Sequence, residues 1–144
     1  MTNSSIQSTL QNPALFQADA WINGHWIPWS SRFAVDNPAN GEVIAQVSNL
    51  GASEAEAAIA AAEVALPAWR SKTAKERSVI LRRWFDLIVA NSDDLARILT
   101  LEQGKPLAEA KGEVAYGASF LEWFAEEAKR VAGSIPASTW GDKL

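Results

Sequence analysis

The spacing of the apolar residues changes once along this chain, near residue 51, and this change constrains the fold more than any other feature. Before it, Val43, Ala45 and Val47 recur at every second position, which is the period of a β-strand. After it, apolar residues recur at every third or fourth position, which is the period of an amphipathic helix. The sequence of 144 residues therefore predicts one mostly α domain with a small N-terminal β layer.

Two Asn-Gly pairs mark the turns of the β layer, which is predicted over residues 20–50. Asn23-Gly24 lies between apolar residues in "WINGHWIPW" and predicts a β-hairpin, because both residues adopt positive φ readily. Asn40-Gly41 follows a proline turn and precedes the alternating strand. Residues 1–11 are polar, and we expect them to be mobile.

Four amphipathic helices are predicted behind this layer, over about residues 53–69, 73–90, 92–103 and 106–131. Capping signals set their expected starts: two Ser/Thr-x-x-Glu boxes, Ser53 with Glu56 and Thr73 with Glu76, and a Ser92 cap. Breaker residues set the expected stops and the last start: Pro67 kinks or ends the first helix, Gly104 ends the third, and Pro106 opens the fourth.

The fourth helix has two apolar faces, where a surface helix needs one. The first face is ordinary packing and consists of Leu107, Ala110, Val114, Leu121, Ala125 and Ala128. Tyr116, Phe120 and Trp123 form a second row, so the helix is either covered on both sides or lines a cavity. From spacing alone, a central helix with aromatic core filling is the simpler interpretation. Gly112 and Gly117, both unfavourable inside a helix, indicate close approach by another element.

Several classes of function are disfavoured by composition. The net charge of -4 without a basic cluster argues against nucleic acid. The absence of cysteine excludes disulfides, thiolate metal sites and a cysteine nucleophile within these residues. The N-terminus lacks the pattern of a signal peptide, and no apolar stretch is long enough to span a membrane. We expect a cytoplasmic protein with neither a nucleic-acid nor a membrane partner.

Isolated motifs add no chemistry to this picture. Gly104-Lys105 is not a phosphate-binding P-loop, because Leu99 stands at the position of its first glycine and Pro106 at that of its Ser/Thr. His25 has no partner at metal-ligand spacing and is expected to face solvent. Composition and spacing therefore identify no catalytic or cofactor-binding residue.

Four blocks nevertheless carry a family resemblance: "INGHW", "DNPANGEVIAQV", "ALPAWRSKTAKERSVILRRWFDLI" and "LEQGKPLAEAKGEV". Together they resemble the N-terminal part of the aldehyde dehydrogenase superfamily. The last block, continued by "YGASFLEWFAEEAKR", is similar to its NADP-preferring succinate-semialdehyde dehydrogenase branch. The resemblance implies that residues 12–136 form the N-terminal part of a cofactor-binding domain, a truncated piece of the α/β aldehyde dehydrogenase fold, and that 137–144 are a truncated tail.

The resemblance also implies a chemistry whose residues follow the point where this sequence stops. In that family a cysteine thiolate attacks the aldehyde, hydride passes to NADP or NAD, and a glutamate activates the hydrolytic water. We therefore expect a fragment, a truncated gene product or half of a split gene, with no catalytic or cofactor-binding residue of its own and no activity alone. The full-length enzyme is expected to be a homo-oligomer that takes a small aldehyde.

Two sets of residues receive a role from the resemblance. Tyr116, Phe120 and Trp123 correspond to the side of a helix that borders the substrate tunnel, where an apolar wall would orient the substrate and exclude water. Asp36 and Glu102 correspond to positions near a structural monovalent cation in some members. For Glu102, an exposed acid near a helix end is the alternative.

Three functional interpretations remain open at this stage. The full-length protein oxidises succinate semialdehyde to succinate in 4-aminobutyrate degradation, or it acts on another semialdehyde such as glutarate semialdehyde. Alternatively, the chain is a non-catalytic helical module that pairs with a separately encoded remainder. In each case helix faces shaped for a missing partner should leave an apolar surface beyond the roughly 300–600 Å² patch of a typical monomer.

Overall fold

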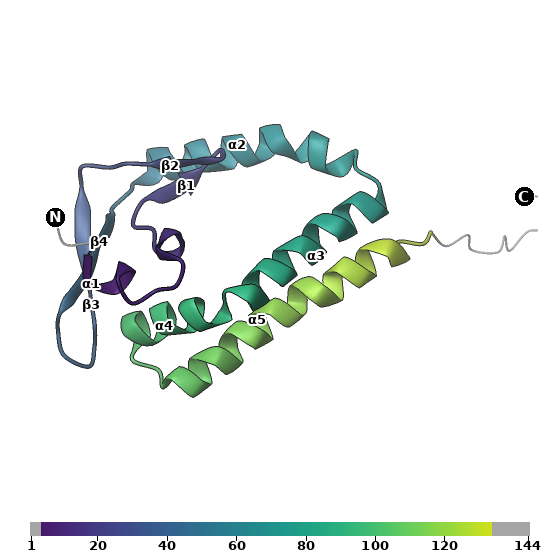
Figure 1. Cartoon of the computed structure of the whole chain (residues 1–144). Helices are drawn as coiled ribbons and strands as arrows, with labels where there is room; N and C mark the ends of the chain where they lie inside the picture. The colour runs from purple at the N-terminus through teal and green to yellow at the C-terminus, as the bar shows by residue number, and fades with distance from the viewer. Residues whose placement is uncertain (1–3, 134–144) are drawn as a thin grey trace, which may run out of the picture.

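The computed structural model describes residues 4–133 (Figure 1). In chain order its elements are α1 (Ser4–Gln7), the 3₁₀ helix η1 (Pro13–Leu15), β1 (Ala20–Ile22), β2 (His25–Ile27), β3 (Arg32–Asp36), β4 (Val43–Ser48), α2 (Ala52–Arg70), α3 (Ala74–Ala90), α4 (Ser92–Gln103), α5 (Leu107–Glu127) and the 3₁₀ helix η2 (Ala128–Arg130). The predicted fold class, four long helices with a small β layer, is confirmed. The predicted tail at 137–144 and the last three residues of the predicted 12–136 domain lie outside the described residues.

The β layer consists of two separate antiparallel pairs within the described part of the chain. β1 pairs with β2 around the Asn23-Gly24 turn, where both residues have positive φ (51° and 80°), so the predicted hairpin is confirmed. β3 pairs with β4, with a register shift between Val35 and Asp36. Asn40-Gly41 lies in the turn between these two strands, and Gly41 has a φ of 73°.

Some helix ends follow the local signals in the sequence. Thr73 and Glu76 form the predicted capping box: the Glu76 N–H donates to Thr73 Oγ1 (3.3 Å) and the Thr73 N–H donates to Glu76 Oε2 (2.7 Å). Gly104 ends α4 in the left-handed conformation (φ 76°). A Cβ at Gly104 would lie 2.8 Å from Cγ of Pro38, so glycine is required here by conformation and by space.

Other helix ends differ from the prediction. α2 starts earlier than the predicted Ser53 cap, at Ala52, because the Glu54 carboxylate reaches back to accept from the Gly51 N–H (2.9 Å). α4 has Asn91 rather than Ser92 as its N-cap residue, and the Asn91 side chain forms no capping hydrogen bond to the first turn of α4. Of the two alternatives at Pro67, an end of the helix is excluded, because α2 runs three residues further to Arg70, one residue beyond its predicted end. The regular part of α5 stops at Glu127, before the predicted end at 131, and η2 follows it.

Residues 4–11 differ from the expectation that residues 1–11 are mobile, and residues 1–3 lie outside the described part of the chain. Ser4–Gln7 forms α1, and the side chains of Ile6 and Leu10 are buried. Together with Phe16 they pack on Ile44 and Ala45 of β4, in the main apolar core cluster. The segment is polar overall, but Ile6 and Leu10, four positions apart, are apolar and hold it against the core.

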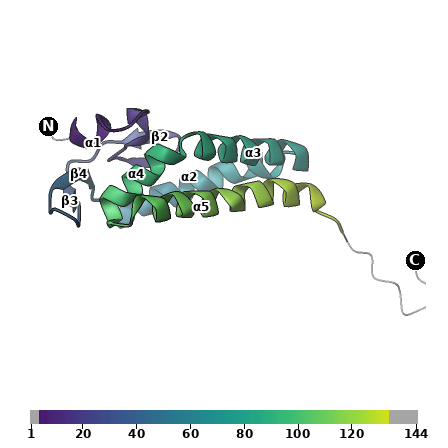
Figure 2. The ribbon, with the colours of Figure 1, turned by 60° about the horizontal axis from the view of Figure 1, so that its bottom comes forward.

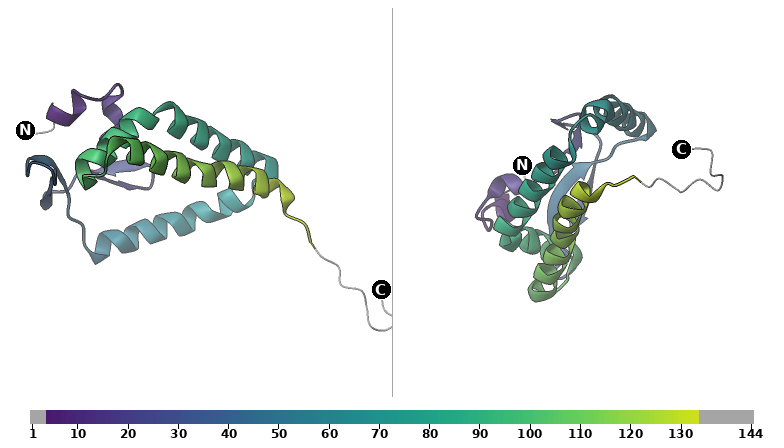
Figure 3. Two further views of the ribbon diagram at one scale, coloured as in Figure 1. Left: turned by 90° about the horizontal axis from the view of Figure 1, so that it is seen from below. Right: turned by 90° about the vertical axis from the view of Figure 1, so that its right-hand side faces the viewer.

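The helices bury small side chains and leave large ones exposed. α3 and α5 run side by side and α4 packs on α5, whereas α2 lies apart from them and contacts β1 (Figures 1 and 2). Figure 3 shows α2 as a separate layer from below. The buried residues of α4 and α5 are Asp94, Ala96, Ala110, Ala118 and Ala125, and α2 buries none. Large apolar side chains are exposed on α2, α3 and α5, and the expected area of the apolar patch stays a prediction.

No helix among residues 4–133 has both the length and the apolar character that a membrane crossing requires.

Candidate functional site

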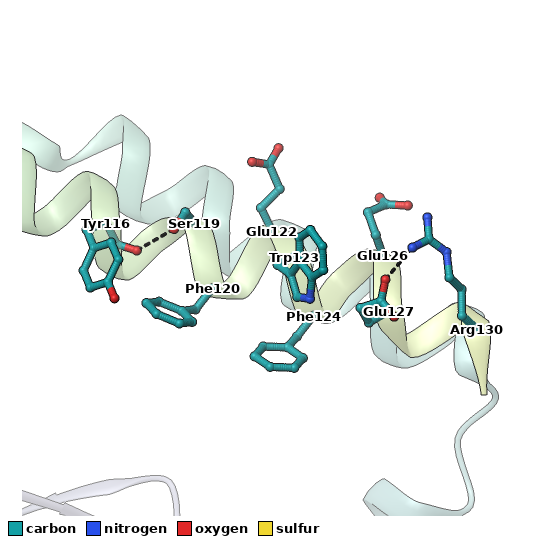
Figure 4. A pocket seen from close by; sticks show the side chains of 9 residues that line it. All are labelled: Tyr116, Ser119, Phe120, Glu122, Trp123, Phe124, Glu126, Glu127 and Arg130. Atoms are coloured by element: carbon teal, nitrogen blue, oxygen red, sulfur yellow. Dashed lines mark hydrogen bonds and ion pairs between the residues drawn. The ribbon is translucent and has the colours of Figure 1, made fainter. Parts of the chain in front are cut away.

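The second apolar face of α5 is open to solvent and is the candidate site. Tyr116, Phe120 and Trp123 are 66%, 47% and 63% exposed, and the rings of Tyr116 and Phe120 meet edge-to-face with centroids 5.0 Å apart. Phe124, exposed as well, extends the row by one residue that the sequence analysis did not select. Figure 4 shows Tyr116, Phe120 and Phe124 projecting from the same side of α5, away from Glu122.

The opposite face of α5 explains why the aromatic row stays free. Ala110, Ala118 and Ala125 are fully or almost fully buried where α5 packs on α3 and α4. The small side chain of alanine allows these helices to approach one another closely. The close approach predicted at Gly112 and Gly117 is not found within residues 4–133, where a Cβ added at either glycine would meet nothing within 4 Å.

An open hollow of about 720 Å³ lies along this row (Figure 4). The residues that line it all come from α5 and η2: Tyr116, Ser119, Phe120, Glu122, Trp123, Phe124, Glu126, Glu127 and Arg130. A hollow lined by a single stretch of helix is one wall of a site and encloses nothing by itself. Its aromatic surface suits an apolar ligand or a packed partner.

The charges at the edge of the hollow are paired with one another. Arg82 Nη1 contacts Glu122 Oε1 (3.2 Å), and Lys129 Nζ contacts Glu126 Oε2 (2.6 Å). Arg130 pairs with Glu127. The hydrogen bond from Lys129 lowers the pKa of Glu126. A carboxylate with a lowered pKa is a weaker general base.

Asp36 and Glu102, the candidate cation residues, lie on elements that meet. The β3–β4 turn lies against the end of α4, where Pro38 is directly beside Gly104. Both residues are exposed, and the protein atoms around the Glu102 carboxyl shield it from part of the solvent, which raises its pKa. Within residues 4–133 no group of three or more His, Cys, Asp or Glu side chains comes together as a metal site, so a cation here would rely on backbone oxygens.

The described residues do not fit a dinucleotide site. Such a site needs a parallel βαβ unit with a glycine-rich turn at a helix N-terminus, whereas the strands found within residues 4–133 pair only in antiparallel hairpins. Gly104 ends a helix and Lys105 pairs with Glu113, so neither belongs to a phosphate loop. His25 is exposed on β2, as predicted.

Asp94 is a buried charged residue that the sequence analysis missed. Its side chain lies in the first turn of α4, with 4% of the residue exposed. Oδ1 accepts from the Gln11 N–H (3.0 Å) and Oδ2 from the Asn12 N–H (2.7 Å). An acid in the first turn of a helix is ordinary, and its partners lie more than 80 residues away, so no local pattern distinguishes Asp94 from Asp93.

Comparison with known proteins gives a consistent picture. A family model described as "Aldehyde dehydrogenase family" matches residues 26–143. A glutarate-semialdehyde dehydrogenase of Pseudomonas putida (strain KT2440) is 60% identical over 130 residues, which are 88% of this chain and 27% of that protein. The NADP(+) succinate-semialdehyde dehydrogenase of Escherichia coli K12 is 55% identical over 136 residues, 93% of this chain and 28% of that protein.

Solved structures agree with this match. The crystal structure of succinate-semialdehyde dehydrogenase from Burkholderia pseudomallei superposes with a TM-score of 0.89 at 55% identity, over 93% of this chain and 28% of that one. The chain thus spans just over a quarter of the length of the relatives that it matches.

Proposed function

Because this chain belongs to the aldehyde dehydrogenase family, we propose that it is the N-terminal part of an NAD(P)-dependent oxidoreductase that converts succinate semialdehyde to succinate, in 4-aminobutyrate degradation. The observation that carries the proposal is 55% identity, over nearly the whole chain, to two proteins named succinate-semialdehyde dehydrogenase. Both extend well beyond the matched segment, so the activity proposed is that of a protein of their length.

Glutarate semialdehyde is the second candidate substrate. The 60% identity to a glutarate-semialdehyde dehydrogenase favours it. The two substrates differ by one methylene, and a pocket distinguishes such a pair by only about 10- to 200-fold. Arg130, the cation among the residues that line the hollow, already pairs with Glu127, so we assign recognition of the distal carboxylate to the rest of the protein.

The aromatic row on α5 is proposed to form one wall of the substrate tunnel. Its support is geometric: Tyr116, Phe120 and Trp123 are exposed on the face that α3 and α4 leave free, and they line an open hollow. A second surface laid over this row would enclose a dry channel in which a short aldehyde is held in one orientation. The channel would act by positioning and by excluding water, since its edge carboxylates are already paired.

NADP or NAD is proposed to bind to residues that follow this segment, where it would accept the hydride. The described residues offer no dinucleotide cradle, which supports that division. This chain alone is proposed to be inactive, because its sequence has no cysteine to serve as nucleophile. A helical module that pairs with a separately encoded remainder would share the same exposed surface and remains the alternative.

Three smaller proposals accompany this function. A monovalent cation is proposed between the β3–β4 turn and the end of α4, near Asp36 and Glu102, and the contact of Pro38 with Gly104 supports it. The full-length protein is proposed to be a cytoplasmic homo-oligomer. It is also proposed to have no nucleic-acid or membrane partner, and the net charge of -4 supports the first half of that statement.

The decisive experiment is kinetic and uses the intact protein as its gene encodes it. Initial rates of NADPH and NADH formation are measured with succinate semialdehyde, glutarate semialdehyde and propanal. We expect kcat/KM to be highest for succinate semialdehyde and at least tenfold lower for propanal, which lacks the carboxylate. A preference for propanal would refute the substrate class, and a preference for glutarate semialdehyde would select the second candidate.

A further inference from the structure

We propose that Asp94 is a latch that holds residues 4–16 as a strap across the seam between the β3–β4 sheet and α4, and that this strap opens and closes separately from the α3–α5 helices. The inference does not depend on which aldehyde the protein oxidises. It rests on the hydrogen bonds of Asp94 and on the apolar side chains that the strap contributes.

The hydrogen bonds of Asp94 use both of its side-chain oxygens as acceptors. Two consecutive backbone N–H groups, of Gln11 and Asn12, donate to its two oxygens at 3.0 and 2.7 Å. Among side chains, a carboxylate offers two acceptor oxygens on one group with no donor hydrogen. With 4% of the residue exposed, water cannot replace these bonds while the strap is closed. The first turn of α4 favours the negative charge at this place.

The strap also supplies the centre of the apolar core. Ile6, Leu10 and Phe16 are buried against Ile44 and Ala45 of β4. Val35 and Val47 of the sheet and Ile98 and Leu101 of α4 pack around the same cluster. Residues of the sheet and of α4 therefore share one cluster with the strap, and strap opening would uncover apolar surface on both.

The rest of the helical part is held by different contacts. α5 packs on α3 and α4 through Ala110, Ala118 and Ala125, and none of these three belongs to the apolar cluster around the strap. The chain thus has two sets of contacts, one around the strap and one along the helices, and α4 takes part in both. Such separate sets open as separate units when one of them is weakened.

Asp93 provides a matched control for Asp94. It is the preceding residue, also lies in the first turn of α4, and carries the same charge. Its carboxylate is exposed and pairs with Lys111 of α5 (2.6 Å) rather than with the strap. Replacing either acid by its amide therefore removes the same charge from the helix end, and only the Asp94 variant disturbs the latch.

Hydrogen–deuterium exchange read by mass spectrometry tests the proposal in the intact protein. In Asp94→Asn one of the two N–H groups faces an amide donor, so we expect peptides covering residues 6–16 to exchange roughly 10- to 100-fold faster, which corresponds to one lost hydrogen bond to a charged group. Peptides from α5 should be unchanged, and Asp93→Asn should leave the strap unchanged. Unaltered strap exchange in Asp94→Asn, or equal acceleration in α5, would overturn the latch.

A second variant covers the case in which Asp94→Asn does not fold. Ile6→Ala weakens the strap from its apolar side and leaves Asp94 and α4 intact. We expect the amides of residues 6–16, including Gln11 and Asn12, to accelerate together by a common factor. Faster amide exchange only in the residues beside Ile6, with Gln11 and Asn12 still protected, would show that residues 6–16 do not open together. That result would also overturn the proposal.

Discussion

Replacing Phe120 by alanine separates a tunnel wall from ordinary core packing. The Phe120 residue is 47% exposed, so about half of it contacts this chain, and its ring meets Tyr116 edge-to-face. Loss of half the burial of a Phe side chain and of one aromatic pair amounts to about 1–2 kcal/mol of unfolding free energy. A fully buried Phe would cost about 3–5 kcal/mol on the same change.

The kinetic effect of Phe120→Ala should exceed this loss of stability. If the free half of the ring orients the substrate, removing it should lower kcat/KM by roughly 10- to 100-fold. The assay is steady-state turnover of succinate semialdehyde by the full-length protein, beside urea unfolding of the same preparation. Phe33→Ala is the matched control, because Phe33 is 52% exposed on β3, away from the row.

The two variants should differ in activity and agree in stability. Phe33→Ala is expected to leave kcat/KM within about twofold while lowering the unfolding free energy by a similar 1–2 kcal/mol. An unfolding loss above about 3 kcal/mol for Phe120→Ala, with activity falling only as the folded fraction falls, would return the row to plain core packing.

Three further predictions address the fold and the exposed surface. Gly104→Ala should lower the unfolding free energy by about 1–3 kcal/mol, because the φ of Gly104 is 76° and the new Cβ would meet Pro38. Gly112→Ala, with open space around it, should raise the unfolding free energy by about 0.5–1 kcal/mol. Thermal unfolding of both variants measures the two changes, and changes of the same sign would contradict the prediction. Glu76 accepts hydrogen bonds from Thr73 that lower its pKa below the usual 4.5, so the stability it contributes should be complete above pH 4.5 and lost as pH falls through the lowered pKa. The difference in unfolding free energy between wild type and Glu76→Gln, measured by urea titration from pH 7 to 3, should therefore become smaller. A difference that grows at low pH would be inconsistent with this sign. The 144-residue chain made alone should bind a hydrophobic dye and show no NADP-dependent turnover of succinate semialdehyde; a dye-silent, active preparation free of full-length enzyme would refute the proposed division of labour.

Features whose causes lie within a few residues could be predicted from the sequence. The Asn23-Gly24 hairpin, the Thr73–Glu76 capping box and the Gly104 helix end each depend on dihedral preferences or bonds among near neighbours. Where two local signals compete the prediction failed: Glu54 bonds to Gly51 and starts α2 earlier than the Ser53 box suggests. These interactions act over a few residues, so a single local signal predicts the structure and two overlapping signals leave it undecided.

The candidate site was predicted in part. The period of α5 separates two apolar faces, so Tyr116, Phe120 and Trp123 were recognised as one row. Phe124 and the hollow were not, because they depend on which face α3 and α4 cover. The close approach predicted at Gly112 and Gly117 was not found for a similar reason. Alanines and glycines both permit close helix packing, and the sequence of α5 does not show which of them lie at the interface.

The sequence by itself determined the four helices, the hairpins and the family, because periodicity, turn chemistry and matching blocks are properties of residues near one another in the chain. Only the tertiary structure decided that Asp94 holds Gln11 and Asn12, that Ile6 and Leu10 are buried, and that the aromatic face of α5 stays open. These facts depend on contacts between segments far apart in sequence, and such contacts leave no periodic trace in either segment.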